Sequence, residues 1–85
     1  MRVHELRQKE VINIADGCRF GYIVDVIIEK KEGKCTHIII PGPGRVFGVF
    51  GRDQEFKIPW GKIKQIGDDI VLVEVESDKV LVDCE

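Results

Sequence analysis

FGYIVDVIIEKKEGKCTHIII, residues 20–40, is the stretch that decides the fold of this chain. Its first ten residues are rich in β-branched side chains and largely apolar on both alternating faces, which is typical of a strand buried on at least one side. The charged loop KKEGK (residues 30–34) follows, in which Gly33 is free to take a positive φ angle. A second apolar run then ends at Pro41, which has no N–H to donate to a neighbouring strand. These features predict a β-hairpin.

The rest of the chain repeats short β-branched runs between turns that contain Gly or Asp. Alanine occurs once and leucine three times, whereas valine and isoleucine dominate, which favours strands over helices. The polar first ten residues leave room for at most one or two helical turns. We expect an all-β fold, a small partly closed β-barrel of six or seven short antiparallel strands, because closure removes the exposed edges of a small sheet. The further expected strands are residues 11–14, 63–66, 70–75 and 79–82, and residues 57–58 lead into the segment Pro59-Trp60-Gly61.

Length and composition exclude several classes of protein. A chain of 85 residues fits one domain, and its net charge of −2 removes the strong electrostatic case for nucleic-acid binding. No apolar run approaches the roughly 20 residues of a membrane-spanning helix, and the polar start MRVHELRQKE does not resemble a signal peptide. Three widely spaced cysteines indicate reduced thiols rather than a disulfide framework. We therefore expect a cytoplasmic protein without membrane insertion.

Charge is distributed unevenly along the chain. Residues 30–64 carry eight basic and three acidic groups, whereas residues 65–85 carry one basic and seven acidic groups. These segments either neutralise each other within one barrel or pair between two copies. The second interpretation predicts a homodimer.

Few residues offer catalytic or metal-binding chemistry. Ser77, the only serine, lies in an acidic stretch without the sequence of a nucleophile elbow. Cys35 and His37 are two residues apart and so are expected to share a strand face, but a packed cysteine beside a half-exposed histidine explains them more simply. No paired ligand spacing supports zinc. We expect no catalytic residue, no metal and no cofactor, and keep as an alternative a metal- or small-ligand-binding barrel that uses Cys35, His37 and a third thiol.

The most unusual segment is PGPGRVFGVFGR, residues 41–52. It lacks the Lys-Ser/Thr of a phosphate-binding loop and does not open a helix. Its apolar residues either fold back as a lid over the barrel or form an exposed contact surface, where aromatic and arginine residues are enriched. RNA binding through the basic stretch 45–64 is a less favoured alternative. The candidate partner-binding residues are Arg45, Val46, Phe47, Val49, Phe50 and Arg52.

Three fragments in this order and spacing resemble the PRC-barrel domain family. They are DGCRFGYIVDV (residues 16–26), IPW (58–60) and IGDDIVLV (66–73). Within that family, the starts MRVHEL and KEVINI and the middle fragment IIIPG resemble the small stand-alone YlmC/YmxH group, which is associated with sporulation. The likeness covers about residues 1–76, which we take as the domain, and leaves residues 77–85 as an acidic C-terminal tail with a possible short edge strand.

The resemblance implies a small all-β module and a non-enzymatic adaptor that acts by protein–protein contact. It carries over no catalytic residues, and fold similarity does not name the partner.

Overall fold

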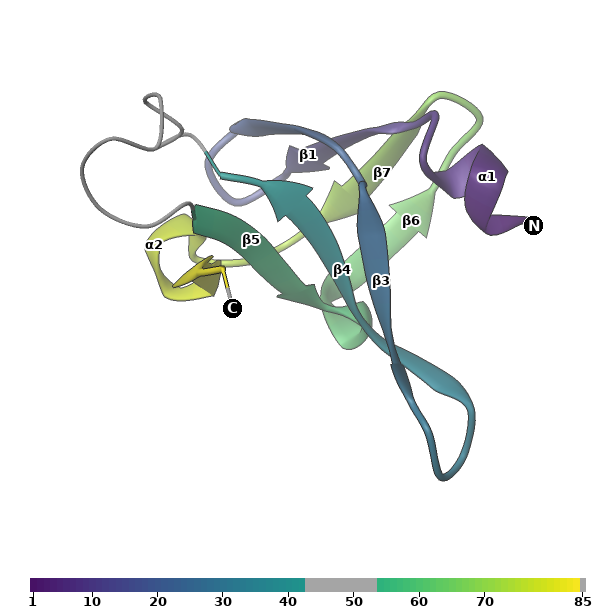
Figure 1. Ribbon diagram of the computed structural model, residues 1–85. Coiled ribbons are helices and arrows are strands. Elements are labelled where there is room, and N and C mark those ends of the chain that lie inside the picture. The colour runs from purple at the N-terminus through teal and green to yellow at the C-terminus, as the bar shows by residue number, and fades with distance from the viewer. Residues whose placement is uncertain (43–53, 85) are drawn as a thin grey trace.

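The computed structural model describes residues 1–42 and 54–84 and arranges them as two four-stranded sheets (Figure 1). Sheet A has the strand order β2-β1-β7-β6, and sheet B has the order β3-β4-β5-β8. The strands of sheet A are β1 (Glu10–Asn13), β2 (Arg19–Tyr22), β6 (Ile63–Ile66) and β7 (Ile70–Val73). Those of sheet B are β3 (Asp25–Glu29), β4 (Lys34–Pro41), β5 (Gln54–Pro59) and β8 (Leu81–Asp83). The helical turns are α1 (Val3–Leu6), η1 (Trp60–Lys62) and α2 (Ser77–Val80).

The hairpin predicted from residues 20–40 is confirmed as the antiparallel pair β3–β4, which projects beyond the sheets at the bottom of Figure 1. Gly33 in its loop has a φ angle of +70°. The run expected as one strand over 20–29 is, however, two strands. It leaves sheet A after Tyr22 and joins sheet B at Asp25. A bulge precedes the break, and Gly21 there takes a φ angle of +103°, which bends the chain from one sheet into the other.

Because this run divides in two, residues 1–42 and 54–84 contain eight strands, above the six or seven expected. One pairing also differs from the expected antiparallel arrangement, since β1 and β7 run parallel. Parallel neighbours need a long connection, and here three strands of sheet B, β3, β4 and β5, lie between them in the sequence. Residues 77–80 form one helical turn, so the last edge strand, expected over 79–82, runs over 81–83. The all-β class is confirmed, and the two open sheets are compatible with a partly closed barrel.

The core lies where the inward faces of the two sheets meet. In β1, β5 and β7 the period-2 alternation supplies buried side chains at every second residue, whereas β4 buries three consecutive residues, Ile38 to Ile40. The rings of Phe20 and Phe56 join the two sheets, with centroids 4.5 Å apart. Leu6 of α1 closes one end of the core. The fully buried aliphatic residues are Val11, Val71 and Val73 from sheet A, Ile38, Ile40 and Ile58 from sheet B, and Ile23 between them.

Candidate functional site

The expected partner-binding residues Arg45, Val46, Phe47, Val49, Phe50 and Arg52 lie outside the described residues. The residues that flank them, Gly42 and Gln54, are described and lie side by side. The Gly42 N–H donates to the Gln54 carbonyl at 2.9 Å, and a Cβ atom on Gly42 would lie 2.7 Å from that oxygen. The segment between them therefore leaves and rejoins sheet B at one point, where β4 and β5 are still paired.

Cys35 and His37 do not share a strand face, contrary to the expectation. The β3–β4 register shifts between them, so that His37 lies opposite Ile27 and Cys35 lies opposite Ile28. Consecutive residues of β3 point to opposite faces, and cross-strand partners share a face. The extra residue of the bulge is Thr36, whose hydroxyl donates to the Ile27 carbonyl at 3.4 Å and lies 2.9 Å from His37 Nδ1. The bulge thus separates the thiol from the imidazole.

The surroundings of His37 favour its neutral form. Burial lowers its pKa, and the positive charge of Lys57 on the adjacent strand β5 lowers it further. Cys84 is engaged elsewhere, because its thiol lies 3.3 Å from Glu55 Oε1. Across residues 1–42 and 54–84, no three His, Cys, Asp or Glu side chains gather as a metal ion would require. The metal-binding alternative therefore finds no ligand set in the described part of the chain.

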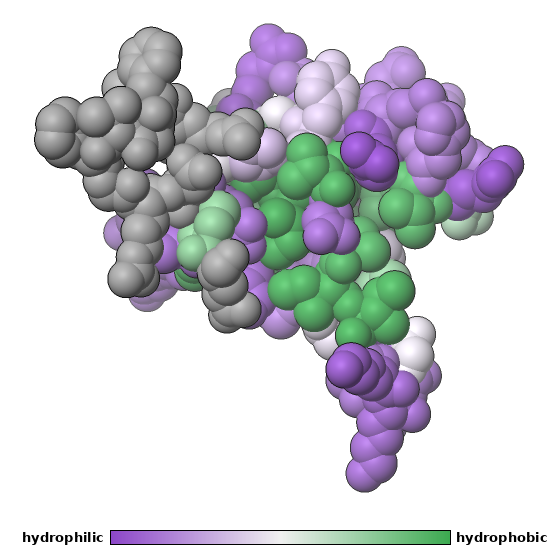
Figure 2. Space-filling model, viewed as in Figure 1, coloured by the Kyte–Doolittle hydropathy of each residue, from purple (hydrophilic) through white to green (hydrophobic). Residues whose placement is uncertain are grey.

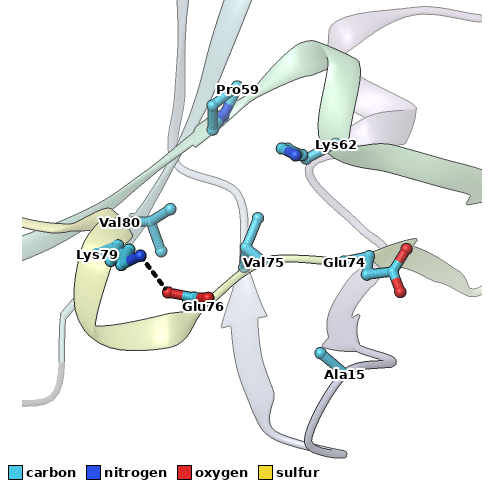
Figure 3. Close-up of a pocket in the computed structure, with 8 residues that line it drawn as sticks. All are labelled: Ala15, Pro59, Lys62, Glu74, Val75, Glu76, Lys79 and Val80. Carbon is cyan, nitrogen blue, oxygen red and sulfur yellow. Dashed lines mark ion pairs between the residues drawn. The ribbon is translucent and has the colours of Figure 1, made fainter.

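Residues 74–76, which we call the crossover, link β7 to the helical turn α2. A pocket of about 400 Å³ opens between the crossover and α2 (Figure 3). Four small or branched residues give it an apolar lining: Ala15, Pro59, Val75 and Val80. Charged residues surround this lining, and Lys79 forms an ion pair with Glu76 at 2.7 Å, which raises the pKa of Lys79. Glu74 pairs with Lys64 at 3.8 Å. Since most of these charges neutralise one another, the pocket can receive an apolar group but assembles no acid–base pair.

Sequence reasoning missed this pocket because its lining comes from four separate segments of the chain. The turn after β1, the end of β5 with η1, the crossover and α2 each supply one or more residues. No motif links them. The only local signal is the change from alternating apolar residues in β7 to the charged sequence that follows it.

Figure 2 shows hydrophobic residues gathered in the middle of one face, over β3 and β4, above the hydrophilic tip of the hairpin. Val24, before β3, and Ile28, within it, have exposed side chains. A second pocket of about 400 Å³ lies on sheet B and is lined by Ile27, Val82, Glu55, Lys57, Asp83 and Cys84. The lining of this pocket thus mixes apolar area with charges of both signs.

The outward face of sheet A combines an apolar strip with polar residues. Val11, Val71 and Val73 point into the core, so the alternate residues of β1 and β7 point away from it. Its apolar members are Ile12, Ile70, Leu72, Tyr22 and, just after β1, Ile14. Its polar members are Glu10, Arg19, Lys64, Gln65 and, just after β7, Glu74. We call these residues the outer face of sheet A. The sequence contained this signal, since Ile70 and Leu72 alternate with the buried valines of β7.

Comparison with known proteins identifies the family of this chain. The family model of the PRC-barrel domain matches residues 1–80. The chain belongs to the PRC-barrel domain family. This PRC-barrel domain is 40% identical over 75 residues to "Probable sporulation protein YlmC" of Bacillus subtilis (strain 168), which covers 88% of the chain and 93% of that protein.

Two further relatives also match this PRC-barrel domain over most of their length. An uncharacterized protein of Clostridium acetobutylicum is 37% identical over 75 residues, covering 88% of the chain and 85% of that protein. The uncharacterized protein YmxH of Bacillus subtilis is 30% identical over 80 residues, covering 92% of the chain and 93% of that protein. The resemblance to the YlmC/YmxH group is therefore confirmed. The names of these relatives assign no enzymatic activity. In the described part of the chain, no helix has the length and apolar character needed to cross a membrane.

Proposed function

We propose that this PRC-barrel domain is a non-enzymatic, cytoplasmic adaptor that works by protein–protein contact, as a homodimer, in sporulation. The observation that carries the proposal is the exposure of large apolar side chains on a small domain. Ile14, Tyr22 and Val24 each have about half of their surface in water. Contiguous exposed apolar area is typical of protein interaction sites.

The energetics of these side chains support a binding role. Burial of apolar area contributes roughly 25 cal/mol for each Å² removed from water. A partner that covers several half-exposed residues therefore gains several kcal/mol, which offsets part of the entropy lost on association. Catalysis has no comparable support, because His37 and Cys35 lie on opposite faces of the hairpin. The sporulation role is proposed from the name of the relative YlmC.

The proposed contact with the partner protein is made by the segment between Gly42 and Gln54. In this proposal, Phe47 and Phe50, with Val46 and Val49, are buried against the partner, and Arg45 and Arg52 lie at the rim of the interface. Aromatic residues and arginine dominate binding energy in such contacts, whereas rim charges contribute less. The net charge of −2 favours a protein partner over a nucleic acid.

Affinity purification from sporulating and vegetative cells of a spore-forming host tests this function. The tagged full chain is compared with a Phe47→Ala/Phe50→Ala variant and with Ile28→Ala, which removes an exposed apolar side chain from the projecting hairpin. We expect a protein that is enriched from sporulating cells by the wild type and by Ile28→Ala, and reduced at least about tenfold by the double variant. Equal recovery with all three chains, or nothing above background with the wild type, would overturn the proposal.

A further inference from the structure

The outer face of sheet A has a composition that differs from that of an ordinary solvent-facing sheet. Sheets with one solvated face usually place polar residues there, in alternation with apolar residues that point inward. In this chain, β1 and β7 place Ile12, Ile70 and Leu72 outward, and Ile14 follows β1 in the next turn, where its N–H donates to the Val73 carbonyl at 2.8 Å. The two strands are adjacent and in register, with Ile12 opposite Leu72, so these side chains form one continuous strip.

No other element in the described part of the chain covers this strip. Helix α1 directs Leu6 into the core, and α2 packs against β5 and β8 of the other sheet. Ile14 and Tyr22 are each about half exposed, and Ile70 is exposed as well. The strip therefore leaves apolar area in contact with water at its ends, whereas Ile12 and Leu72 at its centre are half-buried.

The charges around the strip indicate what kind of surface can cover it. Arg19 pairs with Glu10 at 2.6 Å on the β2 side, and Lys64 pairs with Glu74 at 3.8 Å on the β6 side. The face thus carries two positive and two negative charges and has no net charge. An acidic or basic partner gains no attraction from it, whereas a second copy meets no net repulsion. In a two-fold symmetric pair, the same patch serves both partners.

We propose that two copies of this chain pair through their outer faces of sheet A. This inference deepens the homodimer of the proposed function and rests on it. The central strands β1 and β7 bring Ile12 and Leu72 of one copy against the apolar strip of the other, as in the aligned packing of two sheets. The ion pairs Arg19–Glu10 and Lys64–Glu74 form the polar rim.

The size of the face sets the strength of this dimer. It holds about ten residues, fewer than the roughly 20–30 that each partner contributes to a standard interface. We therefore expect a dissociation constant in the micromolar range rather than a permanent dimer. Gly42 directly follows β4 and Gln54 begins β5, both strands of sheet B, so pairing through sheet A leaves both attachment points of the proposed partner-binding segment outside the interface. A dimer of this kind presents two binding segments to the partner protein.

Sedimentation velocity over a range of about 5–500 μM tests the inference. The mass of the wild type is expected to rise with concentration from 9.7 kDa towards twice that value. Ile14→Lys, which places a like charge on both copies, is expected to weaken association at least about tenfold. The matched control is Ile28→Lys, because Ile28 is also a β-branched residue and is 55% exposed against 49% for Ile14, but lies in sheet B. This control is expected to dimerise like the wild type.

Tyr22→Lys repeats the test from another strand of the face, and circular dichroism verifies that each variant is folded. A wild type that stays monomeric at the highest concentration overturns the inference. A dimer that survives both Ile14→Lys and Tyr22→Lys overturns the assignment of the face. The Phe47→Ala/Phe50→Ala variant is expected to keep the dimer while it loses the partner protein, so failure of the dimer and failure of the adaptor function give different results.

Discussion

The side-chain amide of Asn13 is bound to the backbone of Val75 by two hydrogen bonds. Asn13 Nδ2 donates to the Val75 carbonyl at 2.8 Å, and the Val75 N–H donates to Asn13 Oδ1 at 3.1 Å. The remaining capacity of the amide is also used, by the Ala15 N–H at 3.2 Å and the Ser77 hydroxyl at 3.3 Å. Asn13 is fully buried. Asn13 therefore holds the crossover in place, and the crossover forms one wall of the pocket in Figure 3.

Asn13→Asp is expected to destabilise the domain by about 3 kcal/mol or more at neutral pH. A carboxylate cannot donate to the Val75 carbonyl and places a buried charge beside it. Burial raises the pKa of the new carboxyl in the folded state, so the loss of stability is small below about pH 4 and grows as the pH rises through the folded value. Urea unfolding followed by circular dichroism at pH 4 and pH 7 measures both effects. A variant as stable as the wild type at pH 7 would contradict this role of Asn13.

Gly42→Ala is expected to destabilise the domain by about 1–3 kcal/mol, because the new methyl group would lie 2.7 Å from the Gln54 carbonyl oxygen. That oxygen belongs to the backbone of β5 and cannot move without a shift of the strand. Gly61→Ala is the matched control, since a Cβ atom there meets nothing within 4 Å. Its effect is expected to stay within about 0.5 kcal/mol. Thermal or chemical unfolding of the two variants makes the comparison, and equal effects would contradict the prediction.

The pKa of His37 is expected to lie below the usual value of about 6.5 and to rise in Lys57→Gln, yet not fully to that value. Burial is the larger cause of the lowered His37 pKa and persists in the variant, whereas the repulsion from Lys57 is removed. Between the folded pKa and about 6.5, the unfolded chain binds more protons at this residue, so the contribution of His37 to stability is lost as the pH falls through this window. NMR titration of the imidazole measures the shift. No change on removal of Lys57 would contradict the prediction.

Cys35→Ser is expected to leave the His37 titration unchanged. The bulge at Thr36 places the thiol and the imidazole on opposite faces of the hairpin, so the two groups have no direct interaction. A thiolate–imidazolium pair would instead raise the pKa of the histidine. The same NMR experiment measures the difference, and a shift of about half a unit or more would show that the two residues interact after all.

Much of the fold could be predicted from the sequence because the determining features are local. Alternating β-branched residues, the loop that contains Gly33 and the three family fragments each occupy a short stretch, and the β3–β4 hairpin forms between neighbouring runs. The apolar outer positions of β7, Ile70 and Leu72, were equally visible in the alternation. These properties follow from residue order alone, since strand periodicity and turn geometry depend on adjacent residues.

Only the tertiary structure decided which distant segments meet. The parallel pairing of β1 with β7 brings residues 10–13 beside residues 70–73, and Asn13 binds a residue 62 positions away. The bulge at Thr36, which reverses the expected relation of Cys35 to His37, depends on how β4 fits against β3 and the core. Such a pairing forms only where its long-range contacts stabilise the chain by more than the entropy lost on closing the loop between the strands. The residues next to each strand in the sequence do not determine that balance.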